Sequence, residues 1–395
     1  MIAQVGGKGG IKLLLGMAAQ LQAGKLTLVL PDGSRHAFEG RLPGPAAEMV
    51  LHRARVVRRF LTGGANGFAD SYLDGDWDSP DLAALLKLLA QNEQPFADRY
   101  YGRSWVRVAA RLTHLFRPNT RRGSRKNIHA HYDLGNSFYQ RWLDPSMTYS
   151  AGVYERPDAT LEEAQLAKLR RIAELTGIRP GAHVLEIGCG WGSFAELAAK
   201  EFGAKVTGLT ISQAQAEFAR QRIFEAGLAD RVKIEIRDYR DVEGRFDAVT
   251  SIEMFEAVGE RFWPTYFAKL RDVLKDGGRA ALQVITIHER NWENYRKSAD
   301  FIQRYVFPGG MLPTKTVLDR LASAAGLTCQ TMTGHAEAYA DTLAEWNRRF
   351  QAAWPELAPM GFDRRFKRIW EFYLAYCEAG FRTDNIDVVQ VAYTR

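Results

Sequence analysis

The sequence predicts a doubly wound α/β domain over residues 128–395, preceded by a smaller α+β domain over residues 1–115 and a basic linker over residues 116–127. A length of 395 residues exceeds that of one ordinary domain and favours two. After the linker, short apolar segments alternate with helical ones, as in a parallel sheet covered by helices on both faces. A glycine-rich loop follows an apolar segment at residues 183–187, where such sheets bind ligands.

Turn and capping residues outline the N-terminal domain. Residues 11–21 form an amphipathic helical stretch, and residues 24–30 alternate as a short strand. The turn signal Pro31-Asp32-Gly33 precedes a second strand. Residues 81–92 place their leucines on one face of a helix, for which we expect Ser79 as the N-cap and Pro80 at the first helical position.

The elements of the α/β domain follow from the apolar pattern. The segment at 183–187 is continuously apolar apart from Glu186, as expected of a strand buried on both faces of a sheet. The sequence predicts further strands at 205–209, 232–236, 246–251, 279–285 and 386–393, and helices at 193–202, 212–226 and 263–274. Residues 339–380 are predicted to form a helical insertion rich in aromatic side chains.

Composition and cysteine usage describe a globular protein. Hydrophobic residues make up 46% and charged residues 25%, enough apolar content for a large core. No apolar run approaches the ~18–20 residues that cross a bilayer. The three cysteines, Cys189, Cys329 and Cys377, show no paired spacing, so we expect reduced thiols in the cytoplasm and no metal site.

A basic stretch lies between Asp98 and Asp133, with no acidic residue inside it. Its nine basic residues exceed the net charge of +7, and the first four recur every fourth residue, on one face of a helix. They are Arg99, Arg103, Arg107, Arg111, Arg117, Arg121, Arg122, Arg125 and Lys126. We expect an anionic partner, lipid headgroups rather than nucleic acid, with a merely solvated basic helix as the alternative.

The loop at residues 186–192 predicts a bound S-adenosylmethionine. Its glycines allow a sharp turn and close approach of a ligand. Its spacing departs from G-x-G-x-x-G, and no acidic residue ends the second strand, so a dinucleotide is disfavoured. The predicted cofactor contacts are Glu186, Gly188, Cys189, Gly190 and Gly192 in the loop, Thr210, Ile211 and Gln215 near the ribose, and Asp238 and Tyr239 near the adenine.

Several motifs resemble the cyclopropane-fatty-acyl-phospholipid synthase family over nearly the whole chain. They are His131-Tyr132-Asp133-Leu134-Gly135-Asn136, residues 143–150, the cofactor loop, Met254-Phe255-Glu256, residues 305–310 and residues 353–356, together with residues 67–72 and 75–78 of the N-terminal domain. The resemblance implies a Rossmann-like class I methyltransferase domain with a helical lid insertion and a lipid-binding N-terminal domain. It adds Tyr149 and Ser150 to the cofactor contacts.

The resemblance also implies the chemistry. The family methylates the double bond of an acyl chain in a membrane phospholipid, and a bound bicarbonate then takes a proton as the ring closes. Of the implied bicarbonate ligands, Glu256, Tyr339 and the backbone of Ile285 are present. Ala151 stands where the family has a cysteine and Gln283 where it has a histidine, so bicarbonate is doubtful here.

Two further differences flank the glutamate, because Glu253 replaces a usual glycine and Ala257 a usual histidine. If residues 254–259 are helical, Glu253 and Glu256 share a face, and Glu253 can supply a carboxylate directly. Cys377 matches a cysteine once proposed for catalysis in the family, although a buried cysteine is more often a small apolar residue.

These differences leave several functions open. The chain either forms a cyclopropane, or yields a methyl-branched, methylene or furan-precursor chain without ring closure. An inactive lipid-binding paralogue is a third hypothesis, and a methyltransferase for RNA or a small molecule is favoured by the basic stretch alone. We expect an enzyme on the inner face of the membrane, and the sequence leaves a homodimer open.

Overall fold

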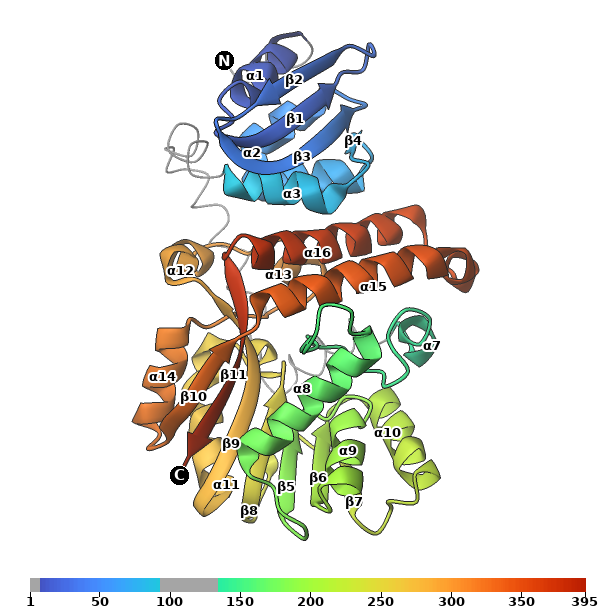
Figure 1. The fold of residues 1–395 in the computed structure, drawn as a ribbon. Helices are drawn as coiled ribbons and strands as arrows, with labels where there is room; N and C mark the ends of the chain where they lie inside the picture. Colours follow the sequence, from blue (N-terminus) through green and yellow to red (C-terminus); the bar gives the residue numbers. More distant parts are fainter. Residues whose placement is uncertain (1–7, 93–133) are drawn as a thin grey trace. The chain divides into compact units, whose positions relative to one another are not determined.

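The computed structural model describes residues 8–92 and 134–395, which belong to two compact units (Figure 1). Unit 1 comprises Met1–Phe116, Asn294–Val306 and Trp354–Asn385, and unit 2 comprises Arg117–Glu293, Phe307–Ala353 and Ile386–Arg395. The predicted division therefore differs from the structure, because residues 294–306 and 354–385 pack with the N-terminal elements. The predicted linker at 116–127 and the basic stretch lie outside the described residues.

Unit 2 is built on a seven-stranded sheet of order β10-β11-β9-β8-β5-β6-β7. All of its neighbouring strands pair in parallel except β11, which is antiparallel to both β9 and β10. The strands are β5 (His183–Ile187), β6 (Lys205–Thr210), β7 (Val232–Ile236), β8 (Phe246–Ile252), β9 (Leu274–Ile287), β10 (Thr328–Gly334) and β11 (Ile386–Thr394). This is the fold class predicted from the apolar pattern.

Helices cover both faces of this sheet, and a separate apolar core lies under each set (Figure 1). The helices on one face are α8 (Leu161–Thr176), α9 (Ser193–Glu201) and α10 (Gln213–Glu225), and those on the other are α11 (Trp263–Val273) and α14 (Lys315–Ala324). Local sequence sets their limits. A capping box formed by Thr160 and Glu163 begins α8, and Gly177, with a φ of 64°, ends it.

The other elements within residues 134–395 are short apart from the helices α15 and α16. They are α7 (Asn136–Tyr139), α12 (Glu289–Tyr295), α13 (Phe301–Tyr305), α15 (Ala336–Leu357), α16 (Arg364–Arg382) and the 3₁₀ turns η2 (Tyr239–Asp241), η3 (Phe255–Ala257), η4 (Glu260–Phe262) and η5 (Ala358–Met360). The predicted helical insertion is thus two helices, α15 and α16. The greater part of α15 belongs to unit 2 and α16 to unit 1.

Unit 1 contains a four-stranded sheet of order β2-β1-β3-β4. Its N-terminal elements are α1 (Lys8–Ala18), β1 (Ala23–Val29), β2 (Arg35–Glu39), β3 (Leu42–Leu51), α2 (Arg55–Leu73), β4 (Trp77–Asp78) and α3 (Leu82–Gln91). The predicted N-cap of α3 was wrong. Asp81, rather than Ser79, caps the helix, because its carboxylate accepts a hydrogen bond from the Ala84 N–H, and Pro80 lies before the helix.

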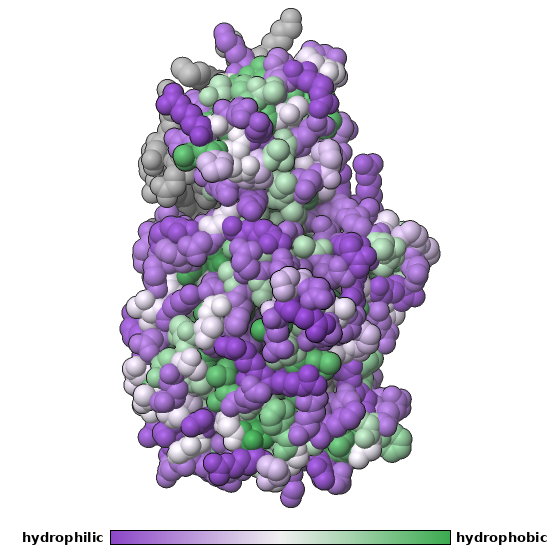
Figure 2. All heavy atoms as spheres, viewed as in Figure 1, coloured by the Kyte–Doolittle hydropathy of each residue, from purple (hydrophilic) through white to green (hydrophobic). Residues whose placement is uncertain are grey.

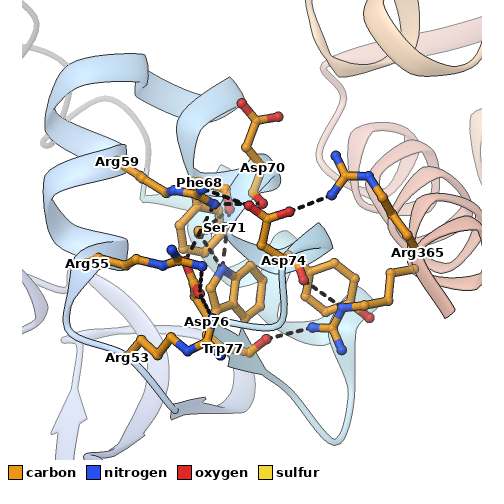
Figure 3. Close-up of polar contacts among 12 residues, drawn as sticks. Arg53, Arg55, Arg59, Phe68, Asp70, Ser71, Asp74, Asp76, Trp77 and Arg365 are labelled. Atoms are coloured by element: carbon orange, nitrogen blue, oxygen red, sulfur yellow. Dashed lines mark hydrogen bonds and ion pairs between the residues drawn. The ribbon is translucent and has the colours of Figure 1, made fainter.

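Acidic residues in the last turn of α2 and just after it hold α13 and α16 against the N-terminal elements of unit 1. The hydroxyl of Tyr305 donates to Asp70. Arg365 pairs with Asp74 (Figure 3). Arg368 donates to the carbonyl oxygens of Tyr72 and Trp77, and its guanidinium lies 4.0 Å from the centre of the Tyr72 ring. This tertiary packing explains why residues 354–385 belong to unit 1.

Asp76 lies at the centre of this network, and its side chain is completely buried. Arg55 donates from Nε to one carboxylate oxygen at 2.7 Å and pairs through Nη2 with the other at 2.7 Å (Figure 3). Arg53 and Arg59 lie at 3.3 Å and 3.5 Å from the same carboxylate. Three guanidinium groups thus offset the cost of burying this charge.

Apolar side chains are concentrated in the cores of the two units. On the face drawn in Figure 2, hydrophilic residues predominate and hydrophobic residues form scattered groups. Within residues 8–92 and 134–395, no helix has the length and apolar content needed to cross a membrane.

Replacing Asp76 by alanine should destabilise the protein by about 2 kcal/mol, because it leaves three arginines without their shared carboxylate. Urea denaturation followed by circular dichroism measures this. Lys25→Ala is the matched control, because its ion pair with Glu39 is 63% and 65% exposed and should contribute less than about 0.5 kcal/mol. Equal midpoints for the two variants would contradict the central place given to Asp76.

Candidate active site

The glycine loop leaves β5 at the carboxyl edge of the sheet. The N–H groups of Gly188 and Cys189 both donate to the carbonyl oxygen of Leu209 on β6, which fixes the loop to the neighbouring strand. Glu186 is buried at the end of β5, and its Oε2 has no hydrogen-bond partner among the described residues. A ligand group placed here would therefore meet an unused buried acceptor.

The three loop glycines adopt positive φ angles, of 85° at Gly188, 52° at Gly190 and 87° at Gly192. A Cβ at Gly188 would lie 2.8 Å from Cγ of Met254, so this glycine permits close packing. A Cβ at Gly190 would meet nothing within 4 Å, so the loop faces open space at this residue. The loop thus combines tight packing at one glycine with room for a ligand at another.

The next two strands end in the other predicted cofactor contacts. Thr210 ends β6 and donates from its hydroxyl to Oε1 of Gln215 at 2.8 Å, and both side chains are buried. Ile211 follows directly, in the turn before α10. These residues lie at the same edge of the sheet as the glycine loop, because β5 and β6 are parallel.

Asp238 and Tyr239 follow β7. Asp238 begins η2, and its carboxylate is bound by Nε and Nη2 of Arg240 at 2.8 and 2.6 Å. The backbone N–H of Arg240 also donates to this carboxylate, at 3.0 Å. Burial raises the pKa of Tyr239 to about 12, which keeps its hydroxyl protonated, and its ring packs edge-on against Tyr266.

Residues 134–151 close around the glycine loop. Asn136 accepts a hydrogen bond from Nε1 of Trp191 at 2.8 Å, and the Thr148 hydroxyl donates to Oγ of Ser193 at 3.0 Å. Arg222 donates to the carbonyl oxygens of Ser146 and Trp191. The sequence did not assign these bridging roles, although Asn136 and Thr148 stand in the motifs that carry the family resemblance.

Tyr149 and Ser150 lie beside an aromatic cluster. The centre of the Tyr149 ring lies 5.1 Å from that of Trp346 on α15. Tyr339, about two turns earlier on the same helix, packs edge to face against Trp346, with ring centres 6.2 Å apart. Trp142 and Phe350 complete this aromatic cluster, and both are fully buried. Aromatic faces near a reacting carbon stabilise positive charge there.

The Glu253 carboxylate accepts three hydrogen bonds. Its Oε1 accepts hydrogen bonds from the Ala151 N–H and from Nε2 of Gln283, both at 2.8 Å. Its Oε2 accepts from the hydroxyl of Tyr339 at 2.6 Å. Donors from three separate segments therefore converge on one side chain.

The backbone of Glu253 is unusual, because its φ is 48° and it follows directly on β8. The predicted helix over 254–259 is instead the short 3₁₀ turn η3, so a shared helical face does not bring Glu253 and Glu256 together. The left-handed conformation costs a non-glycine residue roughly 1–2 kcal/mol. It directs the Glu253 carboxylate to the donors of Ala151, Gln283 and Tyr339.

The neighbouring Glu256 accepts fewer hydrogen bonds than Glu253. One oxygen accepts from the Ile285 N–H at 2.5 Å, and the buried Oε2 has no hydrogen-bond partner among the described residues. Burial and the charge of Glu253 raise the pKa of Glu256 to about 8. Burial also raises the pKa of Glu253, but its three donors oppose this shift. The pair therefore loses its first proton from Glu253, and the proton that remains sits on Glu256.

Comparison with known proteins identifies the family. A model described as mycolic acid cyclopropane synthetase matches residues 119–391. The chain belongs to this family. It is 39% identical over 378 residues to tuberculostearic acid methyltransferase UfaA1 of Mycobacterium tuberculosis, covering 92% of this chain and 86% of that relative. It is 34% identical over 364 residues to cyclopropane-fatty-acyl-phospholipid synthase of Escherichia coli, covering 91% and 90%.

Solved structures of the family share the fold. Mycolic acid cyclopropane synthase CmaA1, crystallised with SAH and CTAB, is 30% identical with a TM-score of 0.65, over 69% of this chain and 98% of that one. MmaA2 from Mycobacterium tuberculosis gives the same values. The predicted class I methyltransferase fold is confirmed, and the cofactor is S-adenosylmethionine. The open space at Gly190 and the unused acceptor of Glu186 fit a ligand of this kind.

The residues of this family member do not fit a bicarbonate. Ala151, Gln283 and Tyr339 stand where the resemblance implies bicarbonate ligands, and all three already donate to Glu253. An added anion would face the negative charge of Glu253 with these donors engaged, so like charges would repel it. The engagement of these donors by Glu253 is therefore a second reason, besides the two missing ligands, to expect no bicarbonate here.

The two singled-out cysteines lie in different surroundings. Cys189 is buried in the apolar core beneath the glycine loop, and burial raises the pKa of its thiol well above the usual value. Cys377 lies on α16 in unit 1, not in unit 2 with Glu253 and Glu256. Burial and then Asp300 raise the pKa of the Cys377 thiol, which disfavours the nucleophilic thiolate.

Replacing Gly188 by alanine should weaken S-adenosylmethionine binding at least tenfold, about 1.4 kcal/mol, because the new Cβ collides with Met254 beside the loop. Isothermal titration calorimetry measures the dissociation constant. Gly227→Ala is the matched control, because Gly227 also has a positive φ, of 69°, but an added Cβ there meets open space. Similar loss of affinity in both variants would show that strain alone, and not the loop's packing, matters.

Proposed function

We propose that this enzyme transfers a methyl group from S-adenosylmethionine to the double bond of an unsaturated acyl chain in a membrane phospholipid and releases a methylene or methyl-branched alkene rather than a cyclopropane. The carrying observation is Glu253, a carboxylate that engages the donors implied for bicarbonate. The base of this member is therefore part of the protein chain.

The reaction balances without an added reductant. S-adenosylmethionine supplies an electrophilic methyl group. The π electrons of the alkene form the new carbon–carbon bond, the methyl–sulfur bond breaks with its electron pair staying on sulfur, and a cation is left on the neighbouring chain carbon. A hydride shift from the methyl-bearing carbon moves the cation there. Glu253 then accepts a proton from the methyl group, and a methylene remains.

The surroundings of Glu253 favour this outcome over ring closure. Burial raises the pKa of Glu253 and its three hydrogen bonds offset part of that rise, so the carboxylate is a weaker base than burial alone would make it, and the cation persists long enough for the hydride shift. The aromatic cluster around Trp346 and Tyr339 stabilises that cation. A ring forms when a base removes the methyl proton before the cation moves.

The names of the relatives support methyl transfer to an acyl chain, with either a branched chain or a cyclopropane as the product. One relative is named a tuberculostearic acid methyltransferase and another a cyclopropane-fatty-acyl-phospholipid synthase. A cyclopropane product is thus the second candidate. An inactive paralogue is disfavoured, because the glycine loop, the paired Thr210 and Gln215, and Glu253 form one coherent site.

We also propose that the enzyme works at the inner face of the cytoplasmic membrane, where it would meet this substrate. The nine basic residues between Asp98 and Asp133 are suited to anionic headgroups. Nucleic acid is disfavoured, because the site offers an aromatic cluster and a buried carboxylate, which suit a cation on an acyl chain. Pelleting with anionic vesicles at increasing salt tests this location, and no loss of binding would contradict it.

The purified protein, given vesicles of unsaturated phosphatidylglycerol and S-adenosylmethionine, should add one CH₂ to the acyl chain as an alkene. Because ring and alkene have equal mass, proton NMR of the isolated fatty acid methyl esters decides between them. Olefinic methylene signals are expected. Upfield cyclopropane signals as the sole product would overturn the proposal.

The variant Glu253→Gln tests the proposed role of Glu253 as the base. It should lower the rate of S-adenosylhomocysteine formation roughly 100-fold or more if proton removal limits turnover, with cofactor affinity kept. Glu243→Gln is the matched control, because Glu243 is an exposed residue between η2 and β8.

A further inference from the structure

A buried lysine lies behind the site and has no role in the chemistry described so far. Lys168, on α8, is completely buried, and its Nζ donates to Oγ of Ser150 at 2.6 Å. One turn earlier on α8, Nε2 of Gln165 donates to the carbonyl oxygen of Ser150 at 2.8 Å. The next residue, Ala151, donates its N–H to Glu253. Two side chains of α8 thus fix the segment that joins a cofactor contact to the base.

The ammonium of Lys168 is surrounded by carboxylates from three elements. Glu253 after β8, Asp144 before the Tyr149-Ser150 segment and Glu186 on β5 all act on it electrostatically. None of them lies within ion-pair distance among the described residues, so no single partner neutralises the ammonium. Glu253 in turn faces Lys168, Tyr339 and the neighbouring Glu256.

Holding Ser150 does not require a charge. A neutral donor would serve a hydroxyl equally well, and burying an unpaired ammonium is costly. What a charge adds at this position is a field over the surrounding carboxylates, which acts at longer range in a dry interior. The geometry therefore points to an electrostatic role.

We infer that Lys168 is a positioning residue that holds Ser150 in place and keeps Glu253 ionised as the base of the reaction. This inference rests on the proposed role of Glu253. Lys168 acts through Ser150 and Glu253, and we do not propose that it touches the acyl chain or the reacting carbon.

The pKa shifts of the buried groups agree with this role. Burial lowers the pKa of Lys168 to about 8, against the opposing effect of Glu253, Asp144 and Glu186, so the ammonium is largely charged at neutral pH. Its charge lowers the pKa of both Glu253 and Glu186 against the larger effect of burial. Removing the charge must therefore raise the pKa of Glu253. Because a base acts only when deprotonated, the acidic limb of the rate profile must then move to higher pH.

Three variants of Lys168 in the full-length protein separate charge from hydrogen bonding. Lys168→Gln keeps a donor for Ser150 and removes the charge, Lys168→Met removes both, and Lys168→Arg keeps both. Ser150→Ala removes the bonded hydroxyl and leaves the lysine. The rate of S-adenosylhomocysteine formation on unsaturated phosphatidylglycerol vesicles is followed between about pH 5.5 and 9.

We expect the acidic limb to move up by about one pH unit in Lys168→Gln and Lys168→Met and to stay within a few tenths in Lys168→Arg. Ser150→Ala should raise KM for S-adenosylmethionine and leave the limb in place. An unshifted limb in Lys168→Gln, or an equal shift in Lys168→Arg, would overturn the inference. Loss of folding in both charge-removing variants, seen by circular dichroism, would make the ammonium structural and would also overturn it.

The two claims fail separately. A cyclopropane product together with a shifted limb would overturn the proposed alkene and leave Lys168 acting on a site carboxylate. An alkene product with an unshifted limb would do the reverse.

Discussion

The hydrogen bonding of one carboxylate, Glu253, organises the catalytic unit. Its three donors come from a loop, a central strand and a long helix, namely Ala151, Gln283 and Tyr339. Hydrogen bonds to a charged group contribute about 1.5–3 kcal/mol each, which is enough to offset the left-handed backbone of Glu253. Gln283 is itself held by Nε2 of Gln390 on β11, so the contact extends through the sheet. Removing the carboxylate would take away the acceptor that these three donors share.

Much of the fold could be predicted from the sequence because buried parallel strands are locally distinctive. The strands β5 and β7 have the predicted limits, since each is a short apolar segment between clear breaks. The membership of α13 and α16 in unit 1 could not be predicted. It depends on contacts such as Arg368 with Tyr72, between residues almost 300 positions apart, which leave no local pattern.

The site shows the same contrast. The glycine loop and the pair Thr210 and Gln215 were found because their positions follow from strand ends. That Glu253 and Glu256 would both serve the site was predicted, but the helix proposed to join them was wrong, because a positive φ at a glutamate has no sequence signal. A role for Lys168 was not predicted from the sequence, because a lysine on a helix is usually exposed to solvent. Its place on the buried face of α8, with Leu161, Leu169 and Ile172, is visible in the helical period and could have revealed it.

In the proposed reaction, a carboxylate supplied by the chain makes an external anion unnecessary. The most direct measurement is the initial rate in buffer depleted of carbon dioxide, compared with the rate after bicarbonate is added, for the wild type and Glu253→Gly. The wild-type rate should not change when bicarbonate is added. The variant frees the donors of Ala151, Gln283 and Tyr339 and should gain activity when bicarbonate is added. A wild-type enzyme that loses most of its activity without bicarbonate would contradict it.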